Sequence, residues 1–193
     1  MSDYRVWDAD FGDEYTKRNR VDWRKRVPFW RDLLVALDVR SILEVGCNAG
    51  WNLTAIRSVY PHIGLHGVEV NHGAMMEAAV AGFSVDKVPV QGLSVPYPFD
   101  LVMTVGVLIH IAPADIQLAM RNIVAASSRY VLAVEYAAEV ETEIEYRGQT
   151  GLLWKRPFGT MYMDMGLRLL EAGLVGKGAG FDDCTFWLME KRA

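Results

Sequence analysis

From Ser41 onward the sequence alternates between short apolar segments and amphipathic segments. Strands are expected at Ser41–Val45, Leu65–Val70, Lys87–Val90, Phe99–Val105, Arg129–Glu135 and Thr185–Glu190. Helices are expected between them at Trp51–Tyr60, His72–Gly82 and Pro113–Ser127. Strands that alternate with helices of this length form βαβ units, whose parallel sheet is covered by helices on both faces. The sequence therefore predicts a doubly wound α/β fold with about seven strands.

Two parts of the chain depart from this alternation. Residues 1–16 are mostly acidic and residues 17–31 are basic, with aromatic side chains spread through both. Because disordered tails are poor in aromatics, we expect a helical N-terminal segment that packs over the domain. Residues 137–157 are polar and irregular, and a helix is expected at Met161–Ala172, with Gly173 as its C-terminal cap.

Composition excludes several classes of protein. A chain of 193 residues has room for one ordinary domain, and its net charge of −4 argues against a nucleic-acid-binding surface over the whole molecule. Cys47 and Cys184 are too few and too far apart for a zinc cluster or a disulfide framework, so we expect no metal. The acidic N-terminus is unlike a secretory signal, and the longest apolar stretch, Leu101–Ala112, is too short to span a bilayer. We therefore expect a cytoplasmic protein.

The most informative segment joins the strand at Ser41–Val45 to the next helix. It reads Glu44-Val45-Gly46-Cys47-Asn48-Ala49-Gly50. In a doubly wound sheet, ligands bind at the carboxyl ends of the strands, and glycines let the backbone approach them closely. Glu69 follows at the end of the next strand, 25 residues after Glu44. An acid in that position can accept both hydroxyls of a ribose, so the pattern indicates a nucleoside ligand.

The spacing of the glycines argues against a dinucleotide. That fingerprint is Gly-x-Gly-x-x-Gly, and Asn48 stands where its middle glycine would touch pyrophosphate. Glu44 would also repel a pyrophosphate, whereas it suits a ligand that carries an ammonium group and a sulfonium. Two alternatives remain open: a nicotinamide-dependent oxidoreductase, and a non-catalytic module that binds an adenosyl compound. Gly46 and Gly50 alone are also compatible with a tight turn that binds nothing.

These motifs resemble those of class I S-adenosylmethionine-dependent methyltransferases. The resemblance rests on the glycine segment, on Gly67-Val68-Glu69-Val70, on Gln91-Gly92-Leu93-Ser94 and on the run from Phe99 to Ile111. It implies a Rossmann-like, mostly parallel seven-stranded sheet with an antiparallel last strand, and S-adenosyl-L-methionine as the cofactor. By the same resemblance, the cofactor-binding residues are Tyr15, Arg18, Asn19, Glu44, Gly46, Cys47, Asn48, Gly50, Glu69, Val70, Gly92, Leu93, Thr104 and Val105.

A finer resemblance extends over nearly the whole chain. Segments such as Phe11–Asn19, Tyr146-Arg147-Gly148 and Asp182–Thr185 are similar to methyltransferases associated with pseudaminic-acid biosynthesis. This implies an N-terminal helical lid at residues 1–40 and a methyltransferase domain at 41–193, with a substrate-recognition insert near 137–157. The expected reaction is methyl transfer to an oxygen or nitrogen of a small polar metabolite, such as a sugar or an amino acid derivative.

Candidate catalytic and acceptor-binding residues follow from position. His110, after the fourth strand, is the leading general base, although it also suits a structural cap of the following turn; Glu135 and Tyr136, at the end of the fifth strand, come next. In the insert, the candidate acceptor-binding residues are Tyr146, Arg147, Lys155 and Arg156. The cations among them suit an acidic group, or they are ordinary surface charge on a β-like arm.

A nucleic-acid acceptor is disfavoured. DNA amino-methyltransferases of this fold place an acid or asparagine followed by prolines after the fourth strand, where this chain has Thr104-Val105-Gly106-Val107. No membrane association is expected, and the sequence leaves the oligomeric state open.

Overall fold

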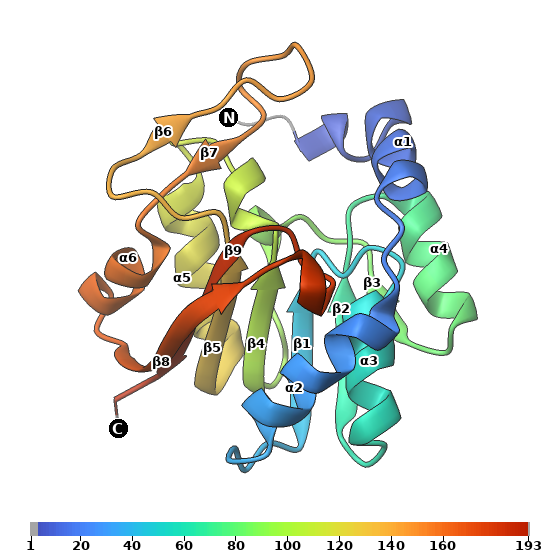
Figure 1. Cartoon of the computed structure of the whole chain (residues 1–193), viewed down its shortest axis with the longest axis vertical. Helices are drawn as coiled ribbons and strands as arrows, with labels where there is room; N and C mark the ends of the chain where they lie inside the picture. The colour runs from blue at the N-terminus through green and yellow to red at the C-terminus, as the bar shows by residue number, and fades with distance from the viewer. Residues whose placement is uncertain (1–3, 193) are drawn as a thin grey trace.

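The computed structural model describes residues 4–192 and contains one seven-stranded sheet (Figure 1). The strands of this sheet are β1 (Ser41–Val45), β2 (Gly64–Val68), β3 (Ser84–Asp86), β4 (Phe99–Val105), β5 (Ser127–Glu135), β8 (Arg168–Val175) and β9 (Cys184–Glu190). Their order is β3-β2-β1-β4-β5-β9-β8; β1 to β5 are parallel, and β9 is antiparallel to both of its neighbours. The predicted Rossmann-like sheet, with an antiparallel last strand, is confirmed.

The helices cover both faces of this sheet. The α-helices are α1 (Asp10–Arg18), α2 (Val27–Leu34), α3 (Trp51–Val59), α4 (His72–Val80), α5 (Ile116–Ala126) and α6 (Phe158–Asp164). Short 3-10 turns are η1 (Tyr4–Val6), η2 (Trp23–Arg26), η3 (Val90–Gly92), η4 (Leu108–His110) and η5 (Lys177–Ala179). None of the helices within residues 4–192 is long and apolar enough to cross a membrane.

Strand alternation builds a separate core on each face. Ile42 packs with Trp30 of α2 and Leu53 of α3, whereas its neighbour Leu43 packs on the opposite face with Met120 of α5 and Phe158 of α6. Successive side chains of a strand point to opposite faces, so one short apolar strand serves both cores. A buried sheet of this kind holds the carboxyl ends of β1, β2 and β4 rigidly at one edge.

Two predicted elements differ from the structure. The helix expected at Met161–Ala172 ends at Asp164, and Arg168–Val175 forms β8 instead, paired with β9. Gly166, at φ +93°, reverses the chain between them, and pairing with β9 outweighs local helix propensity. The third strand lies at Ser84–Asp86, ahead of the expected Lys87–Val90, which ends where η3 begins.

Two further segments flank the sheet: η1 and α1 lie at its carboxyl edge together with residues 137–157, whereas α2 packs on one face beside α3 (Figure 1). Residues 4–34 form η1, α1, η2 and α2, so the helical N-terminal segment is present in the structure. Residues 137–157, called the arm below, include a two-stranded ribbon of β6 (Thr142–Glu143) and β7 (Trp154–Lys155). Residues 1–3 and 193, at the outer ends of the two predicted segments, lie outside the described residues.

Candidate cofactor and active site

A cavity of about 490 Å³ opens at the carboxyl ends of β1, β2 and β4, beneath α1 and η1. In the strand order, β1 lies between β2 and β4, so this is the point at which the winding of the sheet reverses. Ligands of open α/β sheets bind at such switch points, and the volume lies within the usual range for small-molecule sites. The predicted glycine turn, Glu69 and His110 all line this cavity.

The glycine turn is shaped by residues in the left-handed backbone region. Gly46 has φ +71°, and a Cβ at this position would lie 2.5 Å from Cγ2 of Val107. Asn48 also has a positive φ, of 48°, which asparagine tolerates better than most residues. Its side-chain amide donates to the hydroxyl of Thr16 in α1, at 3.1 Å. Asn48 therefore fills the place of the missing glycine and ties the turn to the N-terminal segment.

Glu69 is fastened to the same turn through its carboxylate. Its Oε2 accepts the backbone N–H of Asn48 at 2.8 Å, and its Oε1 accepts that of Asn71 at 2.9 Å. The residue is only 8% exposed, and burial raises its pKa in spite of these hydrogen bonds. Each oxygen of a carboxylate keeps a further lone pair, so Glu69 can accept two hydroxyl groups from a ligand in the cavity.

Glu44 presents a buried acceptor with no partner. Its Oε1 accepts from the side-chain amide of Asn52 at 2.6 Å, whereas its Oε2 has no hydrogen bond. The oxygen of the same Asn52 amide accepts from Arg26 at 2.8 Å. Because of burial, the pKa of Glu44 is raised to about 8. A cationic ligand group beside Oε2 would supply the missing partner, and this fits the ammonium end of S-adenosylmethionine.

The part of the cavity next to β4 differs in detail from the prediction. Val70 and Val105 line the cavity as expected. Leu93 is 7% exposed and packs into the core, while Gly92 also lies outside the lining; the segment Val88–Gln91 lines the cavity instead. Thr104 is fully buried inside the sheet. The structure therefore does not bring Gly92, Leu93 and Thr104 to the cavity wall, and their role as cofactor contacts stays a prediction.

The remaining predicted cofactor residues of the turn are placed by packing. Cys47 lines the cavity, yet its side chain is buried against Gly67, where a Cβ would come within 2.5 Å of Sγ. Gly50, at φ +76°, is the N-terminal cap of α3 and lies against Phe83, outside the lining. Gly50 thus starts the helix behind the turn rather than contacting a ligand.

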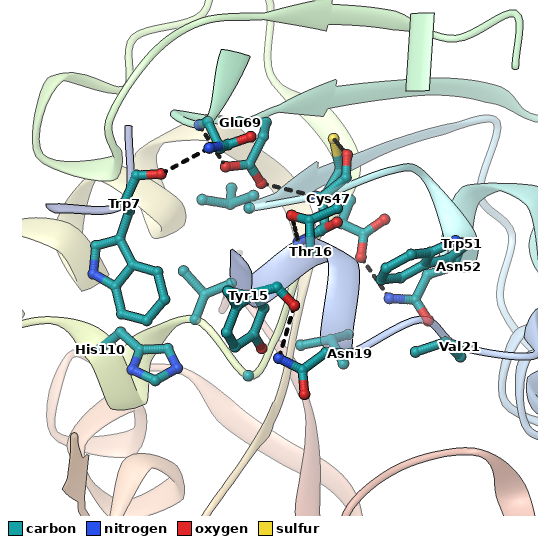
Figure 2. Close-up of a pocket in the computed structure, with 18 of the residues that line it drawn as sticks. Trp7, Tyr15, Thr16, Asn19, Val21, Cys47, Trp51, Asn52, Glu69 and His110 are labelled. Carbon is teal, nitrogen blue, oxygen red and sulfur yellow. Dashed lines mark hydrogen bonds between the residues drawn. The ribbon is translucent and has the colours of Figure 1, made fainter. Parts of the chain in front are cut away.

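The N-terminal segment forms one wall of the cavity, and Figure 2 shows its Tyr15, Thr16 and Asn19 next to the glycine turn. Tyr15, Arg18 and Asn19 of the segment all line the cavity, and the Asn19 amide donates to the Tyr15 carbonyl at 2.9 Å. The guanidinium of Arg18 lies over the rings of Phe11 and Tyr15, at 5.4 and 5.8 Å from their centroids. Arg18 is exposed and has no carboxylate partner within residues 4–192.

Asn71 is the anchor of this segment. Its side-chain amide donates to Asp13 at 2.8 Å and to the carbonyl of Trp7 at 3.1 Å, while Lys87 forms an ion pair with Asp8 at 2.8 Å. Neither Trp7 nor Asn71 was identified as a site residue from the sequence. The sequence did offer a signal for Asn71. It stands two residues after Glu69, just past the carboxyl end of a parallel strand, and such ends lie at the ligand site.

His110 lies at the cavity wall inside an aromatic cluster. Figure 2 shows the indole of Trp7 above the imidazole, with ring centroids 4.3 Å apart, and Tyr15 beside it at 6.1 Å. Its Nδ1–H donates to the Leu152 carbonyl at 2.7 Å. A carbonyl only accepts, so the proton lies on Nδ1 and the lone pair on Nε2. Burial lowers the pKa of His110 to about 4, which keeps the ring neutral at pH 7.

Glu135 and Tyr136 do not line the cavity. Glu135 is fully buried and accepts three backbone N–H groups of the loop after β4: Val107 and Leu108 at 3.1 Å each, and Ile109 at 3.4 Å. The Tyr136 hydroxyl donates to Asp182 at 2.7 Å. Glu135 therefore holds the loop that carries His110, and Tyr136 holds Asp182, which does line the cavity; a catalytic role for either side chain stays a prediction.

The arm contains both exposed and buried candidates. Tyr146 lies 5.7 Å from the His110 ring, measured between centroids, and the exposed Arg147 stacks over Tyr146 at 5.8 Å. Lys155 lies over the ring of Tyr136 at 5.9 Å. Arg156, by contrast, has no exposed surface and is bonded to Glu141 at 2.6 Å. In this structure its guanidinium is directed at Glu141 and at the Leu108 carbonyl, so acceptor binding by Arg156 stays a prediction.

The fold and the cavity together define a Rossmann-like α/β domain with a ligand crevice at its switch point, and comparison with known proteins agrees. No family model matches the chain, and a search of curated proteins finds no match. Among solved structures, the 1,6-didemethyltoxoflavin-N1-methyltransferase of Burkholderia thailandensis superposes with a TM-score of 0.74 at 15% identity, over 100% of this chain and 87% of that one.

Two further structures of the same kind cover nearly the whole chain. The magnesium protoporphyrin IX methyltransferase of Synechocystis, solved with bound S-adenosylhomocysteine, has a TM-score of 0.72 at 12% identity over 97% of each chain. The sugar N-methyltransferase KedS8 of a Streptoalloteichus species has a TM-score of 0.70 at 14% identity, over 96% of this chain and 94% of that one. The chain therefore shares the fold of these methyltransferases.

Proposed function

We propose that this protein is an S-adenosylmethionine-dependent methyltransferase that acts on an oxygen or nitrogen of a small polar metabolite. The observation that carries the proposal is the pair of buried carboxylates at one edge of the sheet. Glu69 has lone pairs free for two ribose hydroxyls, and Glu44 has an unpartnered oxygen for a cationic amino group. A nucleoside that ends in a positively charged amino acid matches both.

The same residues disfavour a nicotinamide cofactor. The amide of Asn48 occupies the place of the glycine against which a pyrophosphate would lie, and it is already bonded to Thr16. Glu44 adds an acidic side chain where a pyrophosphate would bring negative charge. A non-catalytic module that binds an adenosyl compound shares the cofactor site, and is distinguished by whether any methyl group is transferred.

When bound, S-adenosylmethionine supplies an electrophilic methyl group on its sulfonium. The residues of this chain then have three tasks: Glu44, Glu69 and the glycine turn hold the cofactor, the N-terminal segment excludes water, and His110 receives a proton. Nε2 of His110, the nitrogen that does not face the Leu152 carbonyl, would accept the proton that the acceptor oxygen or nitrogen gives up. Holding the two reactants in line can supply about 7–11 kcal/mol of the barrier, so placement matters more than acid–base strength.

The acceptor is expected to meet a wall of aromatic rings and cations. Trp7, Tyr15 and Tyr146 surround His110, and the guanidinium groups of Arg18 and Arg147 stack on this cluster. Such a surface suits the rings of a sugar or amino acid derivative that bears an acidic group. The sequence resemblance to methyltransferases of pseudaminic-acid biosynthesis supports the sugar, as does the sugar acceptor of KedS8.

The proposal is tested by incubating the protein with S-adenosylmethionine carrying a deuterated methyl group and with pools of polar metabolites. Mass spectrometry is expected to show an acceptor that gains one labelled methyl group, with loss of most of this product in His110→Ala. Binding of the cofactor without transfer to any pool would favour the non-catalytic module, and unchanged turnover in His110→Ala would remove this residue as the base.

A further inference from the structure

The turn that carries His110 is attached to the arm at two points. At one point, Nδ1–H of His110 donates to the carbonyl of Leu152. At the other, the Nη1 group of Arg156 donates to the carbonyl of Leu108 at 3.1 Å, so that it reaches across to the first residue of η4. Both contacts join the arm to a turn that is also held by the end of β4, by Glu135 and by core packing of Leu108 and Ile109.

Arg156 is itself fixed within the arm. Its Nε donates to Glu141 at 2.6 Å, its guanidinium lies 5.4 Å from the centroid of the Trp154 ring, and its backbone carbonyl accepts the N–H of Ala138 at 3.3 Å. The guanidinium therefore bridges the two ends of the arm and the η4 turn. Its Nη2 has no partner within residues 4–192, so this cation is incompletely compensated for the loss of water.

A buried arginine of this kind needs an explanation other than stability. Replacing a buried ion pair with apolar residues of similar size is often neutral or stabilising, so burial of Arg156 is weak support for a purely stabilising role. Arg156 does not line the cavity, and its side chain is fully buried. What it contacts is the backbone of η4, two residues before His110.

We propose that Arg156 is a positioning residue, which fastens η4 to the arm and thereby fixes His110 in the tautomer whose Nε2 lone pair is free. The base role of His110 rests on the proposed function, whereas its tautomer does not. The arm then contacts His110 in two ways: the ring of its Tyr146 lies beside the imidazole, and its Arg156 and Leu152 set the orientation of the imidazole. The arm, which is the predicted acceptor-recognition segment, thus also sets the tautomer of His110.

The test is a nitrogen-15 NMR measurement of the histidine rings in the protein without ligands. The chain has four histidines, and the exposed His62 and His72 serve as internal references. In the wild type, His110 is expected to show a protonated Nδ1 with slow proton exchange and an unprotonated Nε2. In Arg156→Met, the Nδ1 proton signal is expected to be lost and the two nitrogen shifts to converge towards the average of the two tautomers.

Methionine suits this test because it fills the buried volume, while Glu141, at 44% side-chain exposure, can be hydrated in the variant. Arg156→Lys keeps a cation with one donor group and is expected to restore part of the Nδ1 signal. The matched control is Arg129→Met, which removes an exposed arginine paired with Glu190 at 3.1 Å and should leave His110 unchanged.

A folded Arg156→Met protein with the wild-type His110 spectrum would overturn the proposal. If that variant fails to fold, Arg156→Lys decides: a weakened Nδ1 signal supports the positioning role, and a wild-type signal contradicts it. Calorimetric titration with S-adenosylhomocysteine separates this question from the proposed function, because Arg156→Met is expected to bind it as the wild type does. Absence of binding in the wild type would refute the cofactor assignment and leave the NMR result to judge the role of Arg156.

Discussion

The carboxylate of Glu69 accepts the backbone N–H of Asn48 at 2.8 Å, and this hydrogen bond joins the end of β2 to the turn that follows β1. Asn48 can hold this geometry because it adopts a left-handed conformation, and its side chain reaches α1 at the same time. One residue thus connects the proposed ribose acceptor, the glycine turn and the N-terminal segment. The site depends on all three being held together.

Replacement of Glu69 should therefore damage the cofactor site more than loss of a single contact would suggest. Hydrogen bonds to a charged group contribute about 1.5–3 kcal/mol each, so the loss of two of them in Glu69→Ala should weaken binding of S-adenosylhomocysteine by a factor of ~100 or more. Glu69→Gln keeps one acceptor and should lose less. Calorimetric titration measures both variants, and an affinity in Glu69→Ala equal to that of the wild type would count against the site.

From the raised pKa of Glu44 we predict that a proton is released when the cofactor binds. Because of burial its pKa is raised to about 8, so the carboxyl group is mostly protonated at pH 7 in the free protein. A cationic amino group beside Oε2 favours the charged form, and the proton must leave. Calorimetry of S-adenosylhomocysteine binding in buffers of different ionisation enthalpy should show this release in the wild type and little of it in Glu44→Gln. Equal proton release in both proteins would exclude Glu44 as its source.

Gly46 is predicted to tolerate no side chain while Val107 remains in place. Gly46→Ala places a residue with a Cβ at φ +71°, which costs about 1–2 kcal/mol, and brings that Cβ to 2.5 Å from Val107. Thermal unfolding should show a clear loss of stability, and cofactor binding should weaken because the turn must move. Val107→Ala in the same chain removes the clash but not the strain, so the double variant should recover part of the loss. No recovery would mean that the clash is unimportant.

From the raised pKa of Glu135 we predict that the stability of the ligand-free protein depends on pH. Burial raises the pKa of Glu135 to about 7, above its value in the unfolded chain. A raised folded-state pKa gives stability that is fully present below the unfolded value, near pH 4.5, and is lost as the pH rises through about 7. The free energy of unfolding is expected to fall over this pH range by an amount on the order of 3 kcal/mol. Urea unfolding at several pH values should show that the free energy of unfolding falls less steeply with rising pH in Glu135→Gln than in the wild type. Parallel curves of this free energy against pH would contradict the prediction.

His110 contributes with the opposite sign over an overlapping range of pH, so its own variant is needed to separate the two contributions. Burial lowers the pKa of His110 to about 4. Its contribution to the free energy of unfolding is therefore complete above pH 6.5, the pKa in the unfolded chain, and is lost as the pH falls towards 4. Comparing His110→Gln with the wild type between pH 4 and 6.5 isolates this part of the pH dependence from that of Glu135. Equal slopes in the two proteins over this range would show that the ring is not buried in the neutral form.

Local pattern was sufficient to predict the elements that position the site. Phe99–Val105 is an apolar run of strand length between turn-forming residues, and the structure has a strand with the same bounds. The turn at Gly46, with Glu69 after the next strand, lines the cavity as predicted, since the parallel topology brings the ends of neighbouring strands together.

Long-range packing decided what the sequence could not. Arg156 and Arg147 are both cations of the arm, yet one is fully buried beneath it and the other is exposed. Only the docking of the arm on η4 distinguishes them. Likewise, Arg168–Val175 has a sequence compatible with a helix, and becomes a strand because β9 offers it an edge to pair with.

The central claim is that an adenosyl compound with a cationic amino group binds between Glu44 and Glu69, and calorimetric titration with S-adenosylhomocysteine tests it most directly. We predict saturable binding of one molecule per chain, which is weakened in Glu69→Ala and is not reproduced by NAD under the same conditions. Failure of the wild-type protein to bind S-adenosylhomocysteine, or tighter binding of NAD, would contradict the account.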